Sequence, residues 1–109
     1  MASDDMYVIM YRIIAYVYSC NKQGAKPELS EWDSMALGIP EQYWAQILYE
    51  LRKDNLIEGV DVYPTGDGLK AVPVSPRVTK EGVAFAHENS MMGKAKQALM
   101  DIKASVPFI

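Results

Sequence analysis

A four-residue segment, Leu37-Gly38-Ile39-Pro40, constrains the fold more than any other part of the sequence. It separates two stretches with helical spacing. Its glycine suits the left-handed end of a short helix that precedes it. Its proline suits the first turn of a helix that follows, because that position needs no backbone N–H donor. The pattern predicts two helices joined by a tight turn, which is the core of a helix-turn-helix.

The predicted helix-turn-helix covers about residues 31–55. Ser30 or Asp33 can cap the short helix before the turn. The longer helix after the turn ends near Asn55. Its apolar residues, Trp44 among them, keep the helical spacing of a face that packs on a core.

A first helix is predicted ahead of this unit. Apolar residues at three- and four-residue spacing place it from Met6 to about Cys20-Asn21, with Ser3 or Asp4 as its cap. Three tyrosines widen the apolar stripe and predict a helix buried on more than one side: Tyr7, Tyr11 and Tyr18.

A hairpin and further helices complete the predicted order. Alternating residues and a turn cluster over residues 64–68 predict a hairpin, or wing, over about residues 59–78. Thr79 can cap another helix, and the C-terminal helices occupy about residues 79–104. With 109 residues, 50% of them hydrophobic, the chain can bury one core. The expectation is a mainly α, single winged helix-turn-helix domain over residues 1–109, with a small β-hairpin and an extra C-terminal helix.

Three stretches carry a family resemblance. They are LGIPEQYWAQILYELRKDNLIEG (Leu37–Gly59), VTKEGVAFAHENSMMGKA (Val78–Ala95) and the final Lys-x-x-x-Pro-x-Ile. They resemble the YjcQ-like proteins of Firmicutes genomes and their phages and prophages. The resemblance implies a winged-helix fold and an origin in a mobile element, and it implies no established activity. Tyr63–Pro73 and the proline-rich stretch 73–76 depart from the family's pattern.

The charge is negative overall and unevenly spread. Its formal value is -3, and residues 1–63 hold five Lys/Arg against ten Asp/Glu, whereas residues 64–109 hold six against four. Strong non-specific binders of nucleic acid usually show a basic footprint, which this chain lacks overall. Any DNA binding must therefore come from a local patch.

The longer helix of the helix-turn-helix carries one such candidate patch on its outward stripe: Gln42, Gln46, Tyr49 and Lys53. Glutamine can bond to adenine and lysine to phosphate, although Glu41 and Glu50 flank the stripe and repel the DNA backbone. On the wing side, Lys70 and Arg77 can contact phosphates. The same stripe also fits a solvated helix face or a protein-binding face.

Catalytic and metal chemistry find little support in the sequence. His87 is the only histidine and is predicted to lie on the surface, and Cys20, the only cysteine, is predicted to be buried. The Gly66-Asp67-Gly68 triplet fits a hairpin turn better than a metal or phosphate loop. We expect no enzyme activity, no cofactor and no metal.

The single cysteine and the short apolar run Met6–Tyr18, which contains Arg12, predict a cytoplasmic protein without a membrane anchor. A separate apolar stripe near the C-terminus predicts a dimer or partner interface: Met92, Leu99, Ile102, Val106 and Phe108.

Two functions are compatible with these observations. One is a small DNA-binding winged helix that binds double-stranded DNA as a homodimer and serves as a phage or prophage transcriptional regulator. The alternative is a protein interaction module without DNA binding, such as an acidic phage-encoded inhibitor that covers a basic surface on a host protein.

Overall fold

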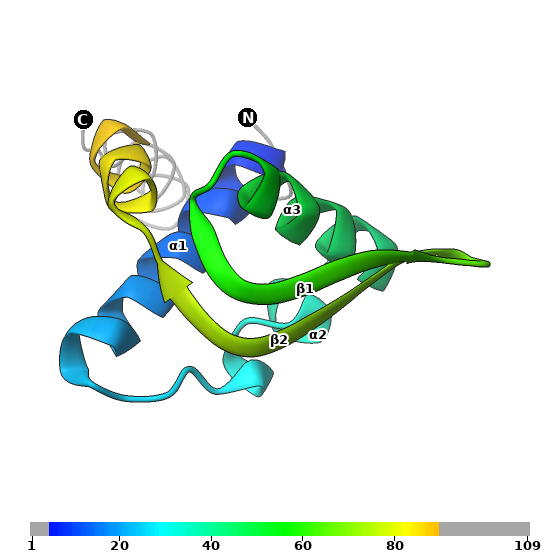
Figure 1. Ribbon diagram of the computed structural model, residues 1–109, viewed down its shortest axis with the longest axis horizontal. Coiled ribbons are helices and arrows are strands. Elements are labelled where there is room, and N and C mark those ends of the chain that lie inside the picture. The colour runs from blue at the N-terminus through cyan, green and yellow to red at the C-terminus, as the bar shows by residue number, and fades with distance from the viewer. Residues whose placement is uncertain (1–4, 90–109) are drawn as a thin grey trace, which may run out of the picture.

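The computed structural model describes residues 5–89, whose elements follow the predicted winged-helix order (Figure 1). The helices and strands are α1 (Met6–Gln23), the 3-10 turn η1 (Leu29–Glu31), α2 (Ser34–Leu37), α3 (Glu41–Lys53), β1 (Ile57–Thr65) and β2 (Gly68–Val78). A further helix covers residues 80–89. The prediction of a mainly α winged-helix fold with one hairpin is confirmed. The predicted extra C-terminal helix beyond residue 89 lies outside the described residues.

Helix α1 begins at Met6, as predicted, but neither of its predicted caps is used. The Asp5 carboxylate accepts a hydrogen bond from the Tyr7 backbone N–H at 3.0 Å, so Asp5 caps the helix in place of Ser3 or Asp4. The helix continues to Gln23, where Gly24 adopts a φ of 71°. No helix within residues 5–89 is long and apolar enough to cross a membrane.

Helix α1 is buried on more than one side, as predicted, because its buried residues include three in succession. They are Val8, Ile9, Met10, Ile13, Ile14 and Val17. Tyr7 is 56% exposed, and Tyr11 and Tyr18 are half-buried. A tyrosine ring at such a position can cover apolar surface while its hydroxyl stays in water.

The helix-turn-helix forms as predicted, except that Pro40 precedes α3 and does not stand in its first turn. The Asp33 carboxylate caps α2 by accepting from the Ala36 N–H at 2.8 Å. Gly38 closes α2 with a φ of 70°, and Pro40, in an extended conformation, stands immediately before α3. At the far end of α3, Asn55 adopts a φ of 59°, a conformation that asparagine tolerates better than most residues.

Two tryptophans hold this unit to the core. Trp44 on α3 is buried, as predicted, and its ring lies 5.9 Å from that of Trp32, which precedes α2. The Trp44 indole N–H donates to the Trp32 carbonyl at 3.0 Å. The rest of the core comes from α1, α3 and the base of the hairpin: Ile9, Ile13, Ile14, Ile47, Leu48, Leu51, Ile57 and Val60.

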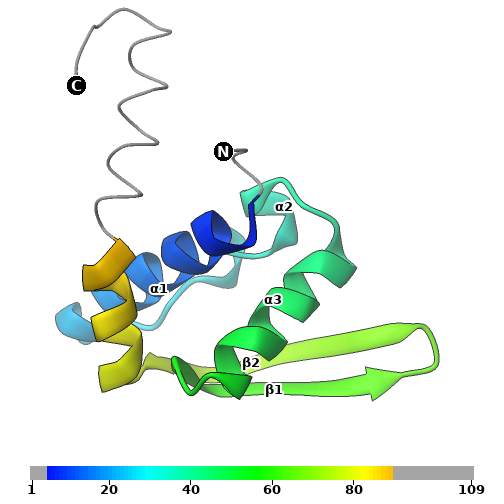
Figure 2. The same cartoon turned by 90° about the horizontal axis from the view of Figure 1, so that it is seen from above.

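The hairpin is longer than predicted and its turn is shorter. Strands β1 and β2 are antiparallel, and the ladder reaches Thr65 opposite Gly68, leaving a two-residue turn (Figure 2). Pro64, predicted to lie in the turn, sits opposite Leu69 in the ladder. The register shifts at Gly59, where a Cβ would lie 1.8 Å from the Ser75 carbonyl oxygen, so only glycine fits this bulge.

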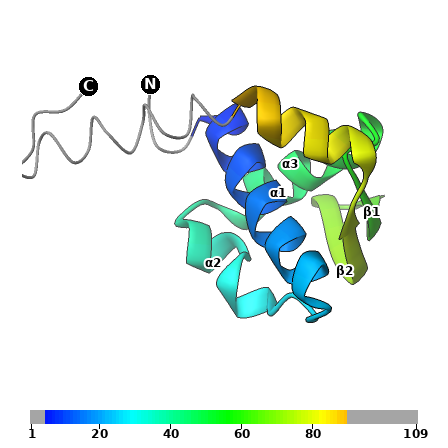
Figure 3. The same ribbon diagram turned by 90° about the vertical axis from the view of Figure 1, so that its left-hand side faces the viewer.

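The helix over residues 80–89 packs on the junction between α3 and β1, beside α1 (Figure 3). The Thr79 hydroxyl accepts from the Gly82 N–H at 2.9 Å, which confirms its predicted capping role, and donates to the Asn55 carbonyl at 2.6 Å. A Cβ at Gly82 would lie 2.2 Å from the Leu56 carbonyl oxygen. This helix is therefore held close to the backbone of the junction.

The close approach at Gly82 predicts an unusual response to substitution. Gly→Ala within a helix ordinarily stabilises it. Here Gly82→Ala should lower the free energy of unfolding by about 1–3 kcal/mol, because the new methyl group overlaps the Leu56 carbonyl. Urea unfolding measures the change. Gly66→Ala, which meets no atom within 4 Å, is the matched control and should stay within about 0.5 kcal/mol of wild type. Equal stabilities for both variants would contradict the described packing.

Candidate functional site

The exposed stripe of α3 and the adjoining wing form the candidate site. The four stripe residues predicted from the sequence are all exposed: Gln42, Gln46, Tyr49 and Lys53. The opposite face of α3 is buried, which orients the helix and fixes which side it offers to a partner.

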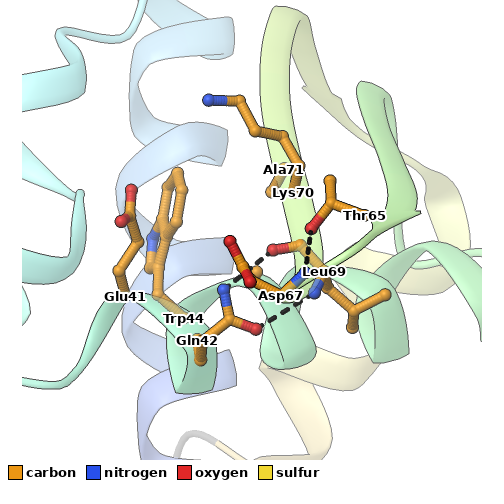
Figure 4. A pocket seen from close by; sticks show the side chains of 9 residues that line it. Glu41, Gln42, Trp44, Thr65, Asp67, Leu69, Lys70 and Ala71 are labelled. Atoms are coloured by element: carbon orange, nitrogen blue, oxygen red, sulfur yellow. Dashed lines mark hydrogen bonds between the residues drawn. The ribbon is translucent and has the colours of Figure 1, made fainter.

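The Gln42 side chain clamps the wing to the start of α3 (Figure 4). Its Nε2 donates to the Leu69 carbonyl at 3.0 Å, and its Oε1 accepts from the Leu69 N–H at 3.0 Å. Both polar groups of the amide are thus used by the wing backbone. Gln42 was predicted to contact DNA; the structure places it as a residue that positions the wing against α3.

A shallow hollow lies between the start of α3 and the end of the wing. The Glu41 and Asp67 side chains line it together with Thr65 and Lys70 (Figure 4). The Thr65 hydroxyl donates to the Gly68 carbonyl at 3.2 Å and accepts from the Asp67 N–H at 3.3 Å, which orders the turn. The hollow is therefore lined by one positive side chain, Lys70, and by two carboxylates, which would repel a phosphate group.

The other two cations predicted to contact phosphate stand in ion pairs. The Lys53 ammonium lies 3.5 Å from the Glu50 carboxylate, and the Arg77 guanidinium lies 3.0 Å from that of Glu58 on β1. The cationic side chains of both pairs are more than half exposed, so each pair contributes at most about 1 kcal/mol and can exchange partners.

The site residues fall into two groups along the wing. Gln42 and Lys70 lie toward the end of the hairpin, whereas Lys53 and Arg77 lie at the end of α3 and at the base of the wing. Tyr63 is a candidate that the sequence analysis did not single out. It stands opposite Lys70 in the ladder and is 45% exposed. Side chains alternate between the two faces of a strand, so Tyr63, two residues after the exposed Asp61, could have been identified from the sequence as an exposed residue.

The remaining candidates form no catalytic or metal-binding cluster within residues 5–89. No group of three His, Cys, Asp or Glu residues there could hold a metal ion. His87 is exposed, as predicted, and Cys20 is half-buried rather than buried. The predicted dimer or partner interface lies outside the described residues: Met92, Leu99, Ile102, Val106 and Phe108.

Comparison with known proteins gives one match. The family model described as YjcQ protein covers residues 11–105 of this chain. No curated protein and no solved structure matches it.

The clamp predicts a local effect for Gln42→Ala. Loss of two hydrogen bonds to Leu69 should cost about 1 kcal/mol of stability. It should also speed hydrogen exchange at the Leu69 amide, which nuclear magnetic resonance can follow residue by residue. Gln46→Ala is the matched control, because Gln46 is exposed on the same helix. Unchanged exchange at Leu69 in the Gln42 variant would show that the clamp does not hold in solution.

Proposed function

The chain belongs to the YjcQ family, and from that premise we propose that it is a winged-helix protein that binds double-stranded DNA through α3 and the wing. The observation that carries the proposal is the exposed stripe of α3 beside a wing that Gln42 fixes against it. A helix of 13 residues with one face free is suited to enter the major groove of B-DNA.

Each exposed side chain has a distinct proposed contact. Gln46 and Tyr49 lie in the middle of the stripe and face base edges, since both are exposed and Tyr49 contacts only the Lys53 ammonium, 5.9 Å from its ring centroid, among the interactions found for the two side chains. Lys53 contacts the DNA backbone at the end of the helix, and Lys70 and Arg77 do so from the wing. Gln42 sets the angle between wing and helix, so that both elements reach the duplex together.

The charges set the expected strength of this binding. The ion pairs of Lys53 and Arg77 compete with binding to DNA phosphates. The carboxylates of Glu41 and Asp67 repel the DNA backbone. We therefore expect a small electrostatic contribution and a non-specific Kd of about 10⁻⁴–10⁻⁶ M. In this proposal the protein is a cytoplasmic, non-enzymatic transcriptional regulator of a phage or prophage.

Fluorescence anisotropy with labelled random duplex DNA, at about 50 and 200 mM salt, tests the proposal. Binding should weaken as salt rises. Combined substitution of Lys53, Lys70 and Arg77 by alanine should reduce the slope of log K against log salt by about 2–3, because each lost phosphate contact removes about 0.9. Binding that is absent at low salt, or unchanged in the triple variant, would overturn the proposal.

Lys22→Ala is a control for the loss of one positive charge away from the proposed site. Lys22 lies in the last turn of α1, with its ammonium 4.9 Å from the ring centroid of Tyr18. Its loss removes one positive charge without touching α3 or the wing. The variant should keep the wild-type salt slope.

A second candidate function is protein binding by the same face. The specific observation in its favour is the pair of carboxylates, Glu41 and Asp67, at the hollow between α3 and the wing. Within residues 5–89 the chain carries twelve Asp/Glu against eight Lys/Arg. Such a surface suits a basic partner, as an inhibitor of a host protein would need.

Affinity purification from a host lysate, with nuclease added, distinguishes the second candidate from the first. A stoichiometric partner that survives nuclease should be lost from the Glu41→Gln/Asp67→Asn double variant. The Glu28→Gln/Glu31→Gln variant removes the same charge away from the hollow and should retain the partner. Equal retention by both double variants would rule out recognition through this hollow.

A further inference from the structure

An open apolar groove lies on the opposite part of the molecule from the wing, between α1, the end of α3 and the helix over residues 80–89. The Tyr7 and Phe85 rings stack along it, with centroids 6.4 Å apart and planes inclined by 26°. Tyr7 is 56% exposed, and Ala84, beside Phe85, is exposed as well. Aromatic surface left in water at a concave site is typical of a docking surface.

Three carboxylates border this apolar floor. Asp54 comes from the end of α3, and Glu81 and Glu88 come from the helix over residues 80–89. All three are exposed, and neither of the two ion pairs found within residues 5–89 includes them. An apolar floor with a negative border fits an amphipathic helix that carries lysines beside its apolar stripe.

The chain itself contains a segment with this chemistry. Over residues 91–104 the sequence places Met92, Leu99 and Ile102 at helical spacing. Lys96 and Lys103 lie beside that stripe at helical spacing, whereas Lys94 and Asp101 lie on the far side. Residues 90–109 thus carry a net charge of +2, whereas residues 5–89 carry -4.

We propose that the groove receives residues 91–104 of a second copy of this chain, so that two copies exchange these segments in a symmetric dimer. Glu81, Ala84, Phe85 and Glu88 present one face of their helix to the groove. Only Ser90 separates that helix from residues 91–104 of the same chain, which is shorter than the loop of about 2–5 residues that joins two antiparallel helices. A second copy enters from outside, and two-fold symmetry fills both grooves with the same contacts.

Charge reversal tests this exchange on the full-length chain. Sedimentation velocity should show a concentration-dependent dimer for wild type. The Glu81→Lys/Glu88→Lys variant and the Lys96→Glu/Lys103→Glu variant should each weaken the dimer by about tenfold or more, because attraction becomes repulsion. Combining all four substitutions should restore the dimer, since the same pairs then meet with their signs exchanged.

The control is Glu28→Lys/Glu31→Lys, an equal charge change near η1, which should leave the dimer intact. Circular dichroism verifies that each variant keeps its helices. A wild-type protein that stays monomeric at every concentration would overturn the proposal. So would a dimer insensitive to Glu81→Lys/Glu88→Lys, or a failure of the fourfold variant to recover. None of these outcomes depends on whether α3 binds DNA.

Discussion

The hydrogen bond from the Trp44 indole N–H to the Trp32 carbonyl is the interaction on which the arrangement of the helices depends. It joins the segment before α2 to the first turn of α3 inside the core, where water cannot compete for either group. The two rings also pack on each other. With that contact formed, the turn at Gly38 has one geometry, and the exposed stripe of α3 faces away from the core.

The hydrogen bonds of Gln42 fix the position of the wing relative to the helices. A two-stranded hairpin is marginally stable by itself, and only the base of this one contributes to the core. Two hydrogen bonds to Leu69 give the outer part of the wing a fixed position relative to α3. As a result, the amide of Gln42, at the start of α3, already bonds to the Leu69 backbone and is not free to bond to a DNA base. In the proposed DNA-binding function, Gln46, Tyr49 and Lys53 are then the residues of the α3 stripe that remain for contacts with DNA.

The sequence predicts the elements well where local chemistry decides them. Asp33, Gly38 and Thr79 act as the caps that their residue types favour, and the apolar spacing of α3 identifies its buried face. It fails where distant segments meet. Pro64 is a residue type that favours turns, but in the structure it pairs with Leu69 and belongs to the β-ladder. Gln42 has the spacing of an outward residue, and only the position of the wing shows that its amide is used.

The contact between Thr79 and Asn55 has a consequence for the order of folding. These residues are 24 positions apart, and the whole hairpin lies between them. The hairpin can form from its two-residue turn, pairing neighbours first and its base last. Once Ile57 meets Val78, the Thr79 hydroxyl is already beside the Asn55 carbonyl, and little further loop-closure entropy is lost. We therefore expect the helix that starts at residue 80 to dock after the wing has closed.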